Sequence, residues 1–235
     1  MTINELMKRQ VDRLQMLRRE KEKALSSGSP DSEVELLDLN IVSCEDAIAM
    51  YEERLKERME SCNLGARWQN RTFENFQPEA QPRAYDQCLA FAKRTANGAN
   101  KSILLSGTVG TGKTHLAAAI AHYCIERNLF VLFGNVVDIF QSLKNAFSTD
   151  EDILSDIKSM QLLVLDDLGK EKQSEWTQET IYSIINYRYE NMLPTVITTN
   201  LTMSDLQSRL GAATVSRLME MCDYVEMNGS DHRII

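Results

Sequence analysis

One glycine-rich stretch of the chain has the residue types and spacing to bind a phosphate. Residues 106–114 read Ser-Gly-Thr-Val-Gly-Thr-Gly-Lys-Thr and match the P-loop pattern G-x-x-x-x-G-K-T. Glycines let such a backbone approach a polyphosphate, and the loop amides and the next helix N-terminus attract the anion. We expect Lys113 to reach the β- and γ-phosphates of ATP and the Thr114 hydroxyl to ligate Mg²⁺. The candidate nucleotide-binding residues of the loop are Gly107, Thr108, Val109, Gly110, Thr111, Gly112, Lys113 and Thr114.

A pair of carboxylates at the end of an apolar run could form the second half of the site. Residues 162–167 read Leu-Leu-Val-Leu-Asp-Asp, the Walker B pattern. A continuous apolar run is typical of a parallel strand buried on both faces, and ligands of open α/β sheets bind at the carboxyl ends of strands. We expect Asp166 to bind both the nucleotide and its Mg²⁺, the latter through water, and Asp167 to polarise the attacking water.

Polar residues later in the chain could complete a hydrolytic site. Asn200 follows the apolar run 194–199, where it could orient the attacking water with help from Thr199; a simple turn asparagine is the alternative. Arg209 and Arg217 follow. A guanidinium can stabilise a transferring phosphoryl group in cis or in trans, or it can lie in solvent, and the pattern does not choose among these three.

The elements around these motifs alternate between strand and helix, which predicts an α/β fold with a parallel central sheet. The expected strands are 103–105, 129–133, 162–166, 194–199 and 223–227. The expected helices are 83–96, 115–121, 136–147, a short one ending near 158, 204–210 and 213–221.

Residues 2–59 have a different character, because Glu, Lys and Arg are dense and Leu and Met recur at helical spacing. We expect helices at 3–25 and from Asp31 or Ser32 onward, folded as an antiparallel α-helical hairpin. The second helix carries apolar residues at alternating steps of three and four, which is a heptad seam: Val34, Leu37, Ile41, Cys44, Ile48, Tyr51 and Leu55. The seam could serve only the hairpin, but docking on a partner protein is favoured because so small a unit buries little area.

The segment between the hairpin and the first strand reads as a connector. Gly65 is expected to end the second helix. The aromatic residues of segment 71–78 could pack near the nucleotide base or in the core, and the sequence leaves both readings open. We therefore divide the chain into an N-terminal hairpin at 1–62, a connector at 63–82 and an ATPase domain at 83–235.

Composition narrows the functional classes. The formal net charge is −8, so the chain is no general polycation, although a local basic stripe is compatible with it. No apolar run approaches the length of a membrane span, and the N-terminus lacks the order of a signal peptide, so we expect a cytoplasmic protein without membrane contact. Five cysteines without a C-x-x-C pair argue against a zinc site and against a disulfide framework.

Taken together, the motifs resemble those of AAA+ ATPases, and within them the DnaC/DnaI group of replicative helicase loaders, which includes phage-encoded members. The resemblance covers about residues 72–235. It rests on five features in this order: Phe73-Glu74-Asn75-Phe76, the P-loop Gly107–Thr114, Leu163–Gly169, Val196–Leu201 and Ser216-Arg217-Leu218.

The resemblance implies further roles. Asn200 is similar to the sensor 1 residue, Arg217 to an arginine finger that acts on ATP in an adjacent subunit, and Arg233 to a nucleotide-contacting arginine near the end of loader ATPase domains. These loaders lack the usual AAA+ helical lid. They assemble as a ring or spiral on a hexameric helicase, contact it through the N-terminal domain and bind single-stranded DNA through the ATPase domain.

Two departures from the family pattern qualify these expectations. Asp167 stands where AAA+ proteins usually have Glu, which puts fast ATP hydrolysis in doubt. The sequence shows no pattern for the zinc-binding N-terminal domain of the DnaI type.

The alternative to a loader is an IstB-like transposition helper ATPase that binds duplex DNA. A small-molecule P-loop kinase is disfavoured, because no arginine-bearing substrate lid follows the P-loop helix.

Overall fold

The computed structural model describes residues 2–146 and 153–231, and within them the chain forms two compact units. Of the described residues, 2–60 and 126–128 form one unit, and 61–125, 129–146 and 153–231 form the other. No helix in the described part is long and apolar enough to cross a membrane.

The first unit contains two long helices, α1 (Ile3–Ser27) and α2 (Asp31–Ser61). Thr2 and Glu5 form a capping box at the start of α1, and Gly28 ends the helix in the left-handed conformation at φ 71°. Leu14 and Leu17 of α1 pack with Cys44 of α2, and the flanking residues of this cluster, Leu37, Ile41 and Ile48, belong to the expected heptad seam. The predicted antiparallel hairpin is therefore present.

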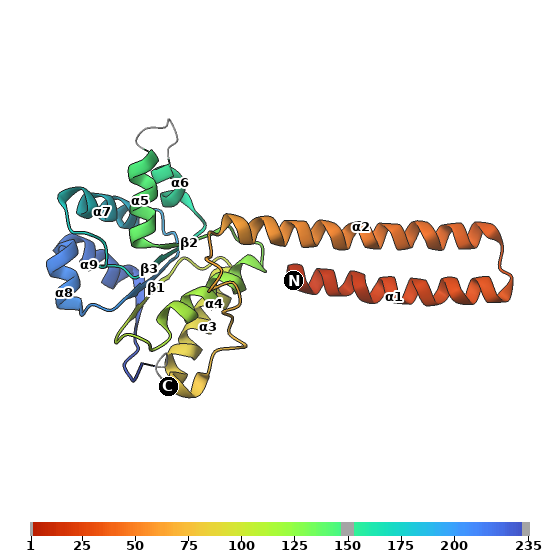
Figure 1. Cartoon of the computed structure of the whole chain (residues 1–235), viewed down its shortest axis with the longest axis horizontal. Helices are drawn as coiled ribbons and strands as arrows, with labels where there is room; N and C mark the ends of the chain where they lie inside the picture. Colours follow the sequence, from red (N-terminus) through yellow and green to blue (C-terminus); the bar gives the residue numbers. More distant parts are fainter. Residues whose placement is uncertain (1, 147–152, 232–235) are drawn as a thin grey trace. The chain divides into compact units, whose positions relative to one another are not determined.

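The described part of the second unit is built on a parallel sheet of five strands in the order β2-β3-β4-β1-β5. Figure 1 labels β1, β2 and β3 of this sheet among the surrounding helices. The strands are β1 (Ser102–Ser106), β2 (Val131–Asn135), β3 (Leu162–Asp166), β4 (Thr195–Thr199) and β5 (Cys222–Glu226). The helices are α3 (Pro82–Ala96), α4 (Lys113–Ile125), α5 (Val136–Ala146), α6 (Ile153–Ser159), α7 (Glu175–Glu190), α8 (Met203–Leu210) and α9 (Ala212–Met221), with a short 3-10 turn at Pro78–Ala80. The α/β fold with a parallel central sheet is confirmed.

Three details differ from the sequence expectations. Strand β2 begins two residues later than predicted, because Phe130 is apolar but 53% exposed and the pairing with β3 starts at Val131. Asn63, at φ 57°, takes the left-handed conformation after α2 that was expected of Gly65, which a short polar side chain tolerates. Helix α7 was not delineated from the sequence.

Apolar side chains fill the space between the sheet and the helices. Strands β1, β3 and β4 are buried along their whole length, as the continuous apolar runs predicted. All five cysteines are buried, and burial raises the pKa of the Cys62 and Cys222 thiols to about 12. The core thus fixes the carboxyl ends of β1, β3 and β4 side by side, which is where the candidate site residues lie.

Candidate nucleotide site

The P-loop joins β1 to α4, as its sequence predicted. Gly107 lies at φ 143°, and a Cβ atom there would fall 2.1 Å from the carbonyl oxygen of Met227, so no larger residue fits. Gly112 lies at φ 94°, and its Cβ would fall 2.8 Å from the ring of Phe76. The Lys113 ammonium donates to the carbonyl oxygens of Gly107 at 2.9 Å and Thr108 at 2.6 Å. The Lys113 ammonium therefore lies within the P-loop, where it is expected to bind the phosphates.

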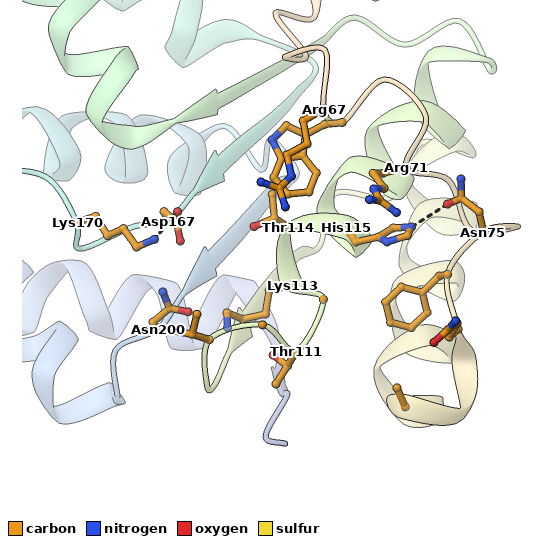
Figure 2. A pocket seen from close by; sticks show the side chains of 17 residues that line it. Arg67, Arg71, Asn75, Thr111, Lys113, Thr114, His115, Asp167, Lys170 and Asn200 are labelled. Carbon is orange, nitrogen blue, oxygen red and sulfur yellow. Dashed lines mark hydrogen bonds and ion pairs between the residues drawn. The ribbon is translucent and has the colours of Figure 1, made fainter. Parts of the chain in front are cut away.

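A cavity of about 300 Å³ opens beside this loop (Figure 2). It brings together predicted residues from three elements, namely P-loop residues up to Thr114, Asp167 after β3 and Asn200 after β4. The lining residues contributed by the loop and its helix are Val109, Gly110, Thr111, Gly112, Lys113, Thr114 and His115. The volume is at the lower end of the range for small-molecule sites.

The two residues expected to hold Mg²⁺ lie together. Asp166 is 4% exposed, its carboxylate accepts a hydrogen bond from the Thr198 hydroxyl at 2.6 Å, and the Thr114 hydroxyl also donates to it. Burial raises the pKa of Asp166, although both of these hydrogen bonds act in the opposite direction. A buried carboxylate beside a hydroxyl is an oxygen-rich pair that fits Mg²⁺, whose charge would compensate the burial.

Asp167 faces the cavity in an unusual backbone conformation. Its φ is 61°, and its backbone N–H donates to the Thr198 hydroxyl at 2.9 Å. Its carboxylate accepts from the Lys170 ammonium at 2.7 Å and from the Asn135 amide at 3.4 Å. Thr198 therefore holds both acids, one by its donor and one by its acceptor. Asp167 is placed on the cavity side, where a water-polarising carboxylate is needed.

Asn200 and Thr199 differ in position. Asn200 lines the cavity beyond the end of β4. Thr199 is fully buried, and its hydroxyl donates to the carbonyl of Leu168 at 2.7 Å and accepts from the N–H of Leu201 at 3.1 Å. The Thr199 hydroxyl therefore ties β4 to the loop after β3, while Asn200 is the residue exposed to a ligand.

The late arginines lie elsewhere. Arg217 on α9 does not line the cavity; its guanidinium lies 5.1 Å from the ring centre of Tyr182 and 5.8 Å from that of Tyr189. Arg209 donates to the backbone carbonyl of Glu171 at 2.6 Å and holds the loop after β3. Arg233 lies outside the described residues. An action of Arg217 on a neighbouring subunit stays a prediction.

The connector supplies cavity residues that the sequence motifs did not identify. They are Arg67, Trp68, Arg71, Asn75, Phe76, Gln77 and Ala80. Both rings of the aromatic pair are buried, and packing of Phe76 near a nucleotide base stays a prediction. Phe76 also lines the cavity and stacks on Tyr85, with ring centres 5.9 Å apart, and Phe73 packs edge-on against Tyr85 and Tyr123. For Arg67 and Arg71 the only signal in the sequence was their position before and at the start of this aromatic segment.

Known proteins are similar to this chain in sequence and in fold. The replicative helicase loader DnaC of Escherichia coli (strain K12) is 32% identical over 156 residues, which are 64% of this chain and 63% of that protein. The phage-like element PBSX protein XkdC of Bacillus subtilis (strain 168) is 31% identical over 191 residues, which are 75% of this chain and 71% of that protein. A crystal structure of the DnaC helicase loader matches with a TM-score of 0.64 and 32% identity, over 69% of this chain and 99% of that one.

These similarities confirm the resemblance to DnaC-type loaders and the AAA+ fold, although the match spans less than two thirds of the length of DnaC itself. The sequence also matches the family described as IstB-like ATP binding protein, over residues 13–234. This match covers the P-loop, the acids Asp166 and Asp167 at the end of β3, and Asn200. The chain therefore belongs to the IstB-like ATP-binding protein family.

Proposed function

We propose that this protein is an ATP-dependent loader that delivers a hexameric replicative DNA helicase to single-stranded DNA. The observation that carries the proposal is the convergence of Lys113, Thr114, Asp167 and Asn200 on one cavity. Similarity to a helicase loader supports the replication role.

Within this site each residue has a distinct task. Lys113 and the loop amides bind the β- and γ-phosphates, while Asp166 and Thr114 hold the metal ion. Bound Mg²⁺ would neutralise charge on the transferred phosphoryl group. Asp167 accepts a proton from the attacking water and Asn200 orients that water by hydrogen bonding. Lys170 and Asn135 both donate to Oδ2 of Asp167, so Oδ1 is the oxygen that would accept from a water. Because Asp167 is one methylene shorter than the glutamate usual at this position, we propose slow turnover.

A neighbouring copy of the chain supplies the remaining charge. Arg217 lies outside the cavity of its own chain, so its guanidinium acts on a bound nucleotide in trans, and the chain assembles as a ring or spiral. Tyr182 and Tyr189 flank the guanidinium and limit its conformations before it meets the neighbour.

The hairpin is the helicase-docking element of the proposal. In the seam between α1 and α2, Cys44 is buried and Leu37, Ile41 and Ile48 are partly buried against α1 residues, so the seam is occupied within the hairpin. On α2, Leu36, Leu39 and Met50 remain 60%, 69% and 55% exposed. Their positions place them on one side of the helix, away from the seam. An apolar face of this kind suits a partner helix better than DNA.

The test of the nucleotide chemistry compares Lys113→Ala with Arg217→Ala. Lys113→Ala should lose ATP binding, measured by titration calorimetry. Arg217→Ala should keep ATP binding but lose turnover and cooperative assembly. Its lost turnover should recover when the variant is mixed with a hydrolysis-deficient Asp167→Asn chain, because each chain then donates the group that the other lacks. Full activity of Arg217→Ala alone would exclude the role in trans.

The second candidate is an IstB-like transposition helper, which the description of the matching family favours. It shares the nucleotide chemistry but predicts ATP-dependent assembly on duplex DNA. Binding assays with duplex and single-stranded DNA of equal length separate the two functions.

A further inference from the structure

The cavity carries more positive charge than the P-loop pattern accounts for. Arg67, Arg71, Lys113 and Lys170 all line it, and Asp167 is the one carboxylate among its described lining residues. The whole chain, in contrast, has a formal net charge of −8. Such local enrichment in an acidic protein favours a polyanionic ligand.

Hydrogen bonds from helix α4 fix the backbone that carries the two arginines. The imidazole Nε2 of His122 donates to the carbonyl of Trp68 at 3.1 Å. Nε2 of His115 lies 3.0 Å from both the carbonyl oxygen of Thr72 and Oδ1 of Asn75. The Asn75 amide nitrogen donates to the carbonyl of Asn70, so Oδ1 of Asn75 is an acceptor and the Nε2–H group of His115 is the donor. Both arginines therefore extend from a backbone segment that hydrogen bonds hold against α4.

Each guanidinium is also placed by its surroundings. Arg67 lies over the Trp68 ring, with 5.4 Å between the guanidinium carbon and the ring centre. Arg71 lies near His115, whose pKa is lowered mainly by burial and in part by the charge of Arg71. In Figure 2 both arginines extend from the connector toward the start of α4, and Arg71 lies near His115. Among the described residues neither arginine has a salt bridge, whereas Lys170 is paired with Asp167.

We propose that Arg67 and Arg71 bind the phosphates of the nucleoside triphosphate in cis, from the connector side of the cavity. The inference rests on the proposed nucleotide site and adds two binding residues to it. Guanidinium groups bind phosphate oxygens through paired N–H donors, so exposed arginines on a fixed backbone are suited to this role. They act within one chain and are distinct from Arg217, which lies outside this cavity.

The test is titration calorimetry of the full chain with Mg-ATP, without DNA. Arg67→Ala and Arg71→Ala should each weaken ATP binding about tenfold, the usual scale for one charge-assisted hydrogen bond, and the double variant should weaken it further. Arg83→Ala is the matched control, because Arg83 is exposed on α3 and does not line the cavity. Equal melting temperatures of the variants would show that the fold is intact.

The outcomes separate this inference from the proposed function. If Lys113→Ala abolishes ATP binding but the double arginine variant binds like the wild type, the inference is wrong and the nucleotide site stands. If Lys113→Ala binds ATP normally, the nucleotide site itself is wrong. If the double variant binds ATP normally but loses single-stranded DNA, the two arginines contact the DNA backbone and the proposal is overturned.

Discussion

Replacing Thr198 by Val tests how Asp166 and Asp167, the two acids at the end of β3, are held. Thr198 is fully buried in β4; its hydroxyl donates to Asp166 at 2.6 Å and accepts from the backbone N–H of Asp167 at 2.9 Å. Valine has nearly the same shape but can form neither bond. Thr198→Val therefore removes a donor from a buried carboxylate and an acceptor from a partly buried N–H group.

The cost follows from these two bonds. A hydrogen bond to a charged group contributes about 1.5–3 kcal/mol to the free energy of unfolding, and a neutral one about 0.5–1.5 kcal/mol. We therefore expect Thr198→Val to lower this free energy by about 2–4.5 kcal/mol, which corresponds to roughly 5–15 °C in Tm for a chain of this size. The Thr198 bond opposes the rise in the pKa of Asp166, so its loss raises that pKa further. The destabilisation should accordingly be largest above the pKa of the folded carboxyl group, where the carboxylate is ionised, and should shrink as the pH falls through that pKa.

The assay is urea unfolding followed by tryptophan fluorescence. Both tryptophans, Trp68 and Trp176, lie in the unit that contains the sheet, so the signal does not report on the hairpin. Thr198→Ser is the matched control, because it keeps the hydroxyl and loses one methyl group, at a cost of about 1 kcal/mol. A valine variant that is as stable as the serine variant would refute the assigned role of the hydroxyl.

Two further substitutions probe the site. Gly112→Ala should reduce ATP affinity at least about tenfold and destabilise the fold by about 1–3 kcal/mol, because the added Cβ would lie 2.8 Å from the Phe76 ring. Gly98→Ala is the control, because Gly98 has a similar φ of 87° but open space around it. Calorimetry should show unchanged ATP binding for the Gly98 variant. Asp166→Asn should abolish hydrolysis but raise the free energy of unfolding without nucleotide, because burial disfavours the ionised carboxylate and raises its pKa. This gain in the free energy of unfolding should be largest at neutral pH and should shrink toward acidic pH. A variant that is less stable than the wild type at both neutral and acidic pH would contradict the prediction.

The site residues carried by local patterns could be predicted from sequence. The P-loop and the acids Asp166 and Asp167 follow from short patterns whose backbone geometry is set by glycines and buried strands. Helix α7 and the exact start of β2 were missed, the latter because Phe130 is apolar yet exposed. A pattern of apolar residues does not distinguish a buried aromatic ring from an exposed one at a strand end.

Residues placed by contacts distant in sequence could not be predicted. The connector is held on α4 by His115 and His122, whose bonds span 43 and 54 residues. Arg188 is a second example: it is fully buried and donates to Thr195 and to three backbone carbonyls, although arginine is ordinarily an exposed residue. Neither feature has a local signal, because each depends on how separate segments meet in the fold.

Mass photometry of the protein mixed with the replicative helicase of its own genome, with and without ATP, tests the central claim most directly. The account predicts a helicase hexamer bound to several copies of this chain in the presence of ATP. The double variant Leu36→Glu/Leu39→Glu should lose this complex, whereas Met16→Glu, at another exposed apolar residue of the hairpin, should retain it. Absence of any complex with the helicase in every nucleotide state, together with ATP-dependent assembly on duplex DNA, would contradict the loader function.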